Sequence, residues 1–173
     1  MLTQRPVDPT HDRDFILDLH CLRAWEDLPN WARNASYRQY REGWLNTSQP
    51  QTFLDELEES IEDERTVAEV WMEEDRPVGF LWIVFSELEG FNLTFAEVRS
   101  LVVATGHQRR GIGGLMLRHA EEEATRCGAL SLRSEMAEDN EAARAMHGKL
   151  GFKIVTYQYE KVLPRPEGAL ATA

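Results

Sequence analysis

The sequence predicts a mixed α/β fold in which strands and helices pack as layers of one domain. Three observations predict it. The chain of 173 residues is long enough for one core, and neither an internal repeat nor a linker divides it. Val- and Leu-rich runs typical of strands alternate with segments whose apolar residues recur at helical spacing. One apolar strand passes through a glycine-rich turn directly into a helix, within residues 97–115. We expect residues 1–163 to form the domain and residues 164–173, which lack periodicity, to form a flexible tail.

The first 65 residues predict one strand and three helices. Residues 2–7 are a candidate strand that prolines end, and residues 10–14 offer a helix cap. Apolar residues at helical spacing then indicate a first helix that ends near Leu28. A second helix is expected from Trp31 to about Leu45. After a loop, Phe53, Leu54, Leu57 and Ile61 mark a third helix.

Two features of these helices leave alternatives open. On the second helix, Tyr37, Tyr40 and Trp44 fall at i, i+3 and i+7, so they share one face. Such a stripe either packs into the core or forms the wall of a substrate pocket. The third helix is surrounded by acidic residues, which is typical of a solvated helix face.

The remainder of the chain predicts five strands and two helices. Residues 66–72 and 77–85 form a strand hairpin, and the second strand is almost wholly apolar, as a central strand would be. Another strand begins near Thr94. The helix after the glycines shows its apolar pattern from Leu115 and ends at Gly128. The last predicted elements are a strand at 129–134, a helix at about 140–150 and a strand at 152–162.

Charge and composition narrow the function classes. Residues 1–75 hold 18 acidic and seven basic side chains, and residues 76–173 hold 12 of each, so the net charge of −11 belongs to the first part. This argues against a nucleic-acid partner. It fits a cationic substrate beside the first part, and it fits a solvated acidic face equally well.

The sequence also bears on location. No apolar run reaches the roughly 20 residues of a membrane span, and the polar N-terminus is unlike a signal peptide. Cys21 and Cys127 lie far apart in helical patterns, which predicts neither a disulfide nor a metal site. We therefore expect no membrane partner, no metal, and a reducing cytoplasmic location.

A basic, glycine-rich turn is the most informative motif. The turn reads Gln-Arg-Arg-Gly-Ile-Gly-Gly at residues 108–114, between a strand and a helix. Unpaired N–H groups and a positive dipole at a helix start favour an anion, and glycines allow it to approach the backbone. The turn is neither a Walker loop nor the dinucleotide Gly-x-Gly-x-x-Gly motif. From these residues alone, both a phosphate site and a plain turn with surface arginines remain open.

A second stretch completes a recognisable pattern. Residues 140–152 read Asn-Glu-Ala-Ala-Arg-Ala-Met-His-Gly-Lys-Leu-Gly-Phe. Together with the turn and the order of elements, this stretch resembles the GNAT superfamily of acyl-CoA-dependent N-acetyltransferases. The turn matches that family's Gln/Arg-x-x-Gly-x-Gly/Ala signature, and the second stretch matches its Asn-x-x-Ala…Leu-Gly-Phe signature. The resemblance covers residues 66–162 well and residues 1–65 only in outline.

The resemblance implies where acetyl-CoA would bind. A GNAT-like mixed central sheet, flanked by helices, would splay open between the strand before residue 104 and the strand at 129–134. The pantetheine arm would pair with backbone groups in this opening, and the pyrophosphate would lie on the N–H groups of the turn. Asn140 and Ala143 would lie beside the pantetheine. The implied backbone partners are Leu101, Val102 and Val103, and the implied phosphate-binding residues are Gln108, Arg109, Arg110, Gly111, Ile112, Gly113 and Gly114.

The resemblance also implies two catalytic residues. Attack on a thioester needs a neutral amine, so a base must accept a proton, and Glu97 is the candidate, directly or through water. The alternative is a surface glutamate paired with Arg99. The family commonly has a tyrosine acid where this chain has His147, whose imidazolium could protonate the leaving thiolate. The alternative is a structural histidine. The N–H of Val102 or Val103 would stabilise the oxyanion.

The sequence therefore predicts an N-acetyltransferase. It would move an acetyl group from acetyl-CoA to a primary amine of a small cationic molecule or of a peptide or protein, by direct attack in a ternary complex. The alternative is a non-catalytic acyl-CoA-binding sensor or interaction module, because the usual tyrosine is missing. Exposed strand edges are also compatible with a homodimer.

Overall fold

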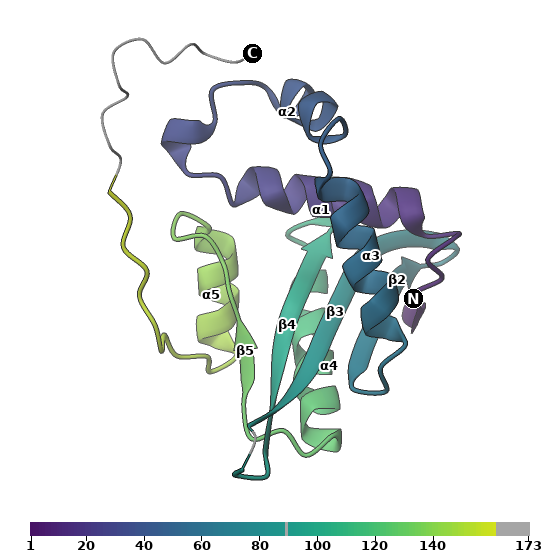
Figure 1. Ribbon diagram of the computed structural model, residues 1–173, viewed down its shortest axis with the longest axis vertical. Coiled ribbons are helices and arrows are strands. Elements are labelled where there is room, and N and C mark those ends of the chain that lie inside the picture. The colour runs from purple at the N-terminus through teal and green to yellow at the C-terminus, as the bar shows by residue number, and fades with distance from the viewer. Residues whose placement is uncertain (89, 162–173) are drawn as a thin grey trace.

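A five-stranded sheet forms the centre of the protein (Figure 1). The computed structural model describes residues 1–88 and 90–161, so the tail predicted at 164–173 lies outside the described residues. From β1 to β4 neighbouring strands are antiparallel, whereas β5 runs parallel to β4. The strands lie side by side in chain order, and they are β1 (Leu2–Pro6), β2 (Thr66–Glu73), β3 (Arg76–Leu88), β4 (Leu93–Val103) and β5 (Leu132–Ser134).

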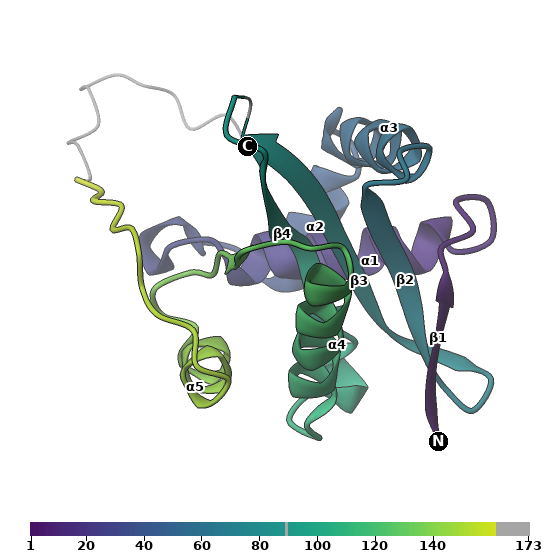
Figure 2. The same ribbon diagram turned by 90° about the horizontal axis from the view of Figure 1, so that it is seen from below.

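Helices cover both faces of this sheet, which confirms the mixed α/β class. On one face lie α1 (Arg13–Glu26), α2 (Tyr37–Trp44) and α3 (Gln49–Ile61). On the other face lies α4 (Ile112–Arg126), with α5 (Glu141–Lys149) beside it, as Figure 2 shows. Two short 3-10 turns, η1 (Asn30–Ala32) and η2 (Thr105–His107), complete the regular elements among the described residues.

Each helical layer packs its own apolar cluster against the sheet. Strand β3 contributes to both clusters, because successive side chains of a strand point to opposite faces. Phe80 packs with the α1–α3 layer and Leu81 with the α4 layer, and both are fully buried. The nearly continuous apolar run of this strand is thus explained by its central position.

The start of α1 follows the predicted cap in place but not in chemistry. Asp12 is the N-cap residue, yet its carboxylate makes no hydrogen bond to the helix. It accepts two hydrogen bonds of 2.7 Å from Arg5 and one of 2.9 Å from the N–H of Asp8. Arg5 therefore holds the pKa of the buried Asp12 carboxyl below its ordinary value. The contact ties α1 to the first strand.

The helix expected from Trp31 to Leu45 is wrong in its first half. The chain forms η1, breaks, and starts α2 only at Tyr37. Ser36 explains the break, because its side chain accepts from the N–H of Gln39 while the Gln39 side chain accepts from the N–H of Ser36. This reciprocal capping box fixes a helix start that periodicity cannot locate.

Other helix starts come earlier than their apolar patterns suggest. Helix α3 begins at Gln49, because Pro50 is pre-set for the first helical turn. Helix α4 begins at Ile112 rather than Leu115, directly after Gly111, whose φ of 84° lies in the left-handed region. Glycine reaches that conformation without strain.

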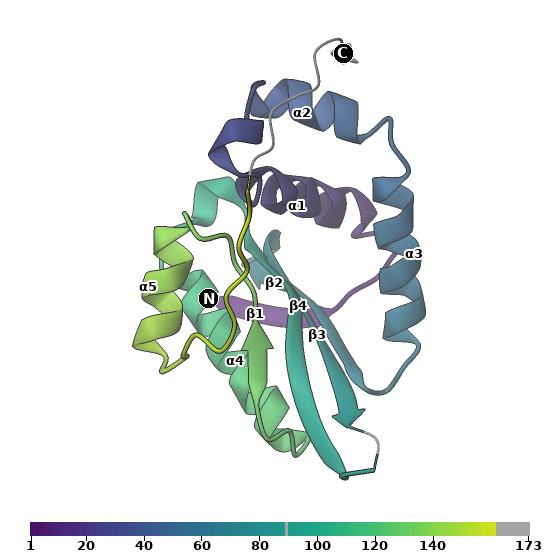
Figure 3. The same cartoon turned by 60° about the vertical axis from the view of Figure 1, so that its left-hand side comes forward.

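The last predicted strand is also wrong within the described residues. Residues 152–161 form no strand, and Val162 lies outside the described residues. The segment runs from the end of α5 back toward η1 (Figure 3), where Trp31 Nε1 donates to Glu160 at 3.1 Å. An alternating pattern gives side-chain orientation but not a hydrogen-bonding partner, and the neighbouring edge strand β5 is only three residues long.

Candidate active site

The pairing of β4 with β5 ends halfway along β4. The parallel register joins Ala96 to Leu132, Glu97 to Arg133 and Val98 to Ser134, and no further pair follows. At the same level, the register with β3 shifts between Trp82 and Ile83, so Arg99 has no partner in that register. A bulge here bends β4 away from its neighbour. This is the splayed sheet that the resemblance implied.

Beyond the bulge, β4 has an open edge, which we define as residues 99–103. Ala104 donates its N–H to Val78 of β3, so by alternation Leu101 and Val103 turn their peptide groups away from β3. Of the two oxyanion candidates, Val103 therefore has its N–H on the open edge, whereas Val102 faces β3. Side chains already occupy two carbonyls of this edge, since Arg23 donates to Arg99 and Gln108 donates to Val103 at 3.2 Å.

The open edge leads to the glycine-rich turn at residues 108–114, the candidate phosphate-binding loop. The first helical bond of α4 runs from the N–H of Leu115 to Gly111, so the N–H groups of residues 112–114 have no acceptor within the helix. No side chain caps this end. A Cβ on Gly113 would lie 3.4 Å from Met146 Sδ and 3.7 Å from Leu101 Cδ2, which are ordinary contact distances, so the start of α4 lies close to both β4 and α5. These open donors fit a phosphate group.

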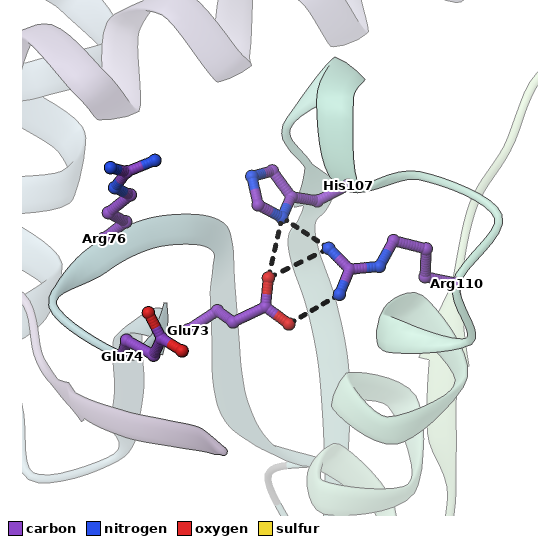
Figure 4. Close-up of a pocket in the computed structure, with 5 residues that line it drawn as sticks. All are labelled: Glu73, Glu74, Arg76, His107 and Arg110. Carbon is purple, nitrogen blue, oxygen red and sulfur yellow. Dashed lines mark hydrogen bonds and ion pairs between the residues drawn. The ribbon is translucent and has the colours of Figure 1, made fainter.

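The two arginines of the loop differ in their surroundings. Arg109 is exposed and has a φ of 59°. Arg110 turns to the outside of the loop and forms two hydrogen bonds with Glu73, of 2.7 and 2.9 Å (Figure 4). The Arg110 guanidinium holds the pKa of Glu73 below its ordinary value. His107 joins this contact at 3.2 Å from Glu73. Arg110 is thus engaged beside the loop rather than over the N–H groups.

The same ion pair lines a polar pocket of about 370 Å³. Glu74, from the turn between β2 and β3, and Arg76, the first residue of β3, form its other wall (Figure 4). The pocket adjoins the phosphate-binding loop but none of its lining residues belongs to the open edge of β4.

Glu97 lies next to the end of the β4–β5 pairing, as the catalytic reading requires. Its carboxylate is 3.1 Å from Arg99 Nη1, so the ion pair considered as the alternative is present. Both side chains are nearly half exposed, and the Arg99 guanidinium also lies 5.8 Å from the Trp82 ring centroid. An exposed ion pair is weak, so it does not hold the Glu97 carboxylate away from a ligand.

His147 lies on α5 and contacts the end of β5. Its Nδ1 is 2.7 Å from the carbonyl oxygen of Ala143, and its Nε2 is 3.0 Å from Ser134 Oγ. The Phe152 ring packs edge-on against the imidazole, with centroids 5.0 Å apart. Asn140 caps α5 by accepting from the N–H of Ala143 at 3.0 Å. The two signature residues Asn140 and Ala143 therefore hold the helix that carries His147.

The structure adds Glu26, which sequence reasoning missed. This half-buried residue ends α1, and its carboxylate hydrogen bonds with the side chain of Gln108 at the start of the phosphate-binding loop. Burial raises the pKa of Glu26. The sequence does not single out Glu26, because the first part of the chain is rich in acidic residues and no local signal distinguishes one glutamate among many.

Arg33 ties the first helices to the β5–α5 connection. It donates to the carbonyl of Glu26 at 2.5 Å and lies 3.2 Å from Asp139. The segment after α1 is thereby held against the start of α5, next to the open edge.

The aromatic stripe of α2 packs into the core, which is one of its two predicted roles, and it also borders a pocket. Trp44 is 4% exposed and belongs to the core, while Tyr37 and Tyr40 pack against that core. Tyr40 and Trp44 also line a pocket of about 360 Å³ with Trp25 of α1. The rings of Trp25 and Tyr40 have centroids 5.2 Å apart.

The described residues contain neither a metal-binding cluster nor a membrane-spanning helix. Within 1–88 and 90–161, no three or more His, Cys, Asp and Glu side chains are grouped so as to hold a metal ion. Over the same ranges, no helix has the length and apolar character needed to cross a membrane.

Comparisons with known proteins place these features in context. Residues 25–152 match the model of the Acetyltransferase (GNAT) family. A search among curated proteins finds no match.

Solved structures share the fold at low sequence identity. A transcriptional regulator from Bacillus halodurans C-125 superposes with a TM-score of 0.69 at 16% identity, over 94% of this chain and 100% of that one. The aminoglycoside antibiotic 6'-N-acetyltransferase AAC(6')-Ih from Acinetobacter baumannii gives 0.61 at 18%, over 94% and 99%. The glucosamine-6-phosphate N-acetyltransferase from Arabidopsis thaliana gives 0.63 at 11%, over 95% and 99%.

Proposed function

Since the chain belongs to the Acetyltransferase (GNAT) family and is therefore an acyltransferase, we propose that it moves an acetyl group from acetyl-CoA to a primary amine. One observation carries this proposal. The open edge of β4, where pairing with β5 has ended, leads directly to the uncapped N-terminus of α4. Backbone groups for an amide-rich arm and donors for a phosphate thus follow one another along the chain.

The binding of acetyl-CoA would use mainly the backbone. Peptide groups of Leu101 and Val103 would pair with the pantetheine arm, and the N–H groups of residues 112–114 would hold the pyrophosphate. Exposed Arg109 would add positive charge. Arg110 would contribute from outside the loop, because Glu73 already engages it at 2.7 Å. Such rim charges add little individually, so the backbone donors would supply most of the specificity.

The chemistry would be direct attack by the amine. Glu97 would accept the proton of the amine, directly or through a water molecule. A backbone N–H on the open edge of β4 would stabilise the negative charge that develops on the acetyl oxygen. His147 would supply a proton to the sulfur that leaves.

The acceptor would be a cationic amine on a small molecule or at a peptide or protein site. The acid excess of residues 1–75 supports a cation, and aromatic faces such as those of Trp25 and Tyr40 attract one. Two proteins of the same fold are named for acetylating an aminoglycoside antibiotic and glucosamine-6-phosphate, and both acceptors are small molecules that carry an amine.

Release of free thiol from acetyl-CoA across a panel of amines tests the function. We expect release that depends on the acceptor, with the acetylated product identified by mass spectrometry. Glu97→Gln should flatten the acid limb of the rate profile. An unchanged profile would remove Glu97 from the mechanism, and Glu26→Gln would then test the half-buried carboxyl group that contacts Gln108.

A non-catalytic acyl-CoA-binding module is the second candidate. Two observations favour it: His147 stands where the family commonly has tyrosine, and a transcriptional regulator shares the fold. Tight binding of CoA, seen as a raised melting temperature, without acceptor-dependent thiol release would support this candidate.

We also propose that the protein is a cytoplasmic homodimer. The free cysteines Cys21 and Cys127 fit a reducing compartment. The dimer would cover the edge strand β5 together with residues 152–161, whose large apolar side chains Ile154, Val155, Tyr157 and Tyr159 are 65% to 91% exposed. Light scattering after gel filtration would give the mass, and a monomer at all concentrations would contradict the dimer.

A further inference from the structure

Ser134 occupies the point where the sheet splays. It is the last residue of β5 to pair with β4, opposite Val98, and it is only partly buried. Its hydroxyl lies 3.0 Å from His147 Nε2. Neither signature of the family resemblance includes this serine, so no sequence motif draws attention to it.

The hydrogen bonds of His147 fix which ring nitrogen carries its proton. A carbonyl oxygen only accepts, so Nδ1 must donate to Ala143 at 2.7 Å. In the neutral ring, Nε2 then accepts from the Ser134 hydroxyl. In the charged ring, Nε2 donates to Ser134 Oγ instead. The hydroxyl satisfies either state by rotating, so this pair can pass a proton without losing a hydrogen bond.

The direction of the open edge brings a reacting group toward Ser134. The phosphate-binding loop follows the far end of β4, and Ser134 pairs with Val98 at the near end. The five residue steps from Val98 to Val103 span about 17 Å of strand. A ligand anchored by phosphate at the loop and running along this edge would have its other end at Ser134. The hydrogen bond between the two side chains keeps His147 Nε2 next to Ser134 Oγ.

We propose that the Ser134 hydroxyl relays the proton of His147 to the leaving sulfur, which makes Ser134 a catalytic residue and His147 a positioning residue that acts through it. This inference rests on the proposed acetyl transfer. The carbon–nitrogen bond forms, and the carbon–sulfur bond breaks with its electron pair left on sulfur. Starting from the charged His147 ring, Ser134 gives its proton to sulfur and takes one from Nε2, which leaves the ring neutral with its remaining proton on Nδ1. The proton that the amine loses to Glu97 returns through water to His147.

Ser134→Ala tests the relay, with Ser134→Thr as the conservative variant and Ser131→Ala as a matched control. Ser131 is an exposed serine just before β5. We expect Ser134→Ala to lower kcat by about a hundredfold, the lower end of general acid catalysis, with the KM for acetyl-CoA within about twofold. Ser134→Thr, which keeps a hydroxyl, should retain kcat within about threefold. The control should match the wild type.

A double variant separates a relay from a structural role. If the two residues act as one unit, Ser134→Ala with His147→Ala should be no slower than His147→Ala alone. Independent, multiplying losses would overturn the proposal, as would full turnover of Ser134→Ala or failure of Ser134→Thr to restore it.

Two further outcomes remain distinct. Covalent acetylation of Ser134 by acetyl-CoA without amine would make Ser134 a nucleophile and overturn the relay. If the wild type shows no acceptor-dependent thiol release, the proposed function itself fails; the relay fails alone when the wild type turns over and the variants do not follow the pattern above.

Discussion

Acidification should destabilise the protein through His20, a partly buried imidazole on α1. Its ring stacks on Phe53 of α3, with centroids 3.7 Å apart and planes 11° apart, and it lies tilted against Trp44 of α2. Its buried Nδ1 has no hydrogen-bond partner among the described residues. Burial, assisted by the charge of Arg23, lowers the pKa of His20 from 6.5 to about 4. The ring is therefore neutral in the folded protein at pH 5.

The unfolded chain binds this proton more readily than the folded protein between pH 6.5 and about 4. Stability therefore rises with pH in that window, is fully present above it, and is lost as pH falls toward 4. Linkage with these two pKa values gives a loss of about 2 kcal/mol at pH 5 relative to neutral pH. For a domain of this size, that corresponds to a fall in melting temperature of roughly 4 to 8 °C.

Urea unfolding at pH 7.5 and pH 5 measures this effect by difference. His20→Phe keeps an aromatic ring but cannot be protonated, so the wild type should lose about 2 kcal/mol more than this variant on acidification. His11→Gln, which alters an exposed histidine near the start of the same helix, should behave as the wild type does. Equal losses for the wild type and His20→Phe would refute the reasoning, and His20→Leu provides the comparison if the larger ring does not fit.

Three further substitutions probe the fold. Ser36→Ala removes the capping box of α2 and should cost about 1 kcal/mol in urea unfolding, and a wild-type midpoint would contradict that assignment. Gly79→Ala brings a Cβ within 3.0 Å of Met116 Sδ and 3.2 Å of a backbone oxygen, so calorimetry should show a lower melting temperature than for the wild type. Asp12→Asn weakens the contact with Arg5 and should cost about 2 to 3 kcal/mol at pH 7. Because Asp12 has a lowered pKa in the folded state, that difference should shrink as pH falls below 4, and a constant difference would exclude the ion pair as its cause.

Much of the fold could be predicted because local patterns reflect burial. The apolar run of β3 indicated a central strand, and this strand is buried on both faces. The pattern failed where boundaries depend on single contacts. Ser36 decides the start of α2 through two hydrogen bonds, whereas helical periodicity continues through the preceding residues.

The candidate site divides in the same way. The candidate phosphate-binding loop could be predicted from the sequence, because a glycine turn between a strand and a helix leaves open N–H donors at the start of the helix. The contacts of Ser134 and Glu26 could not be predicted from the sequence. Their roles depend on contacts with His147 and Gln108, which come from distant parts of the chain.

The sequence by itself determined the class of fold, the glycine-rich turn between a strand and a helix, and the two signatures of the family, because each depends on residues that are neighbours in the chain. Only the tertiary structure decided that the pairing of β4 with β5 ends at Val98, that Arg110 forms an ion pair with Glu73, and that His147 forms a hydrogen bond with Ser134. The physical reason is that a hydrogen bond or ion pair requires atoms within about 3 Å. For residues far apart in sequence, that proximity is set by packing of the whole domain rather than by any local preference.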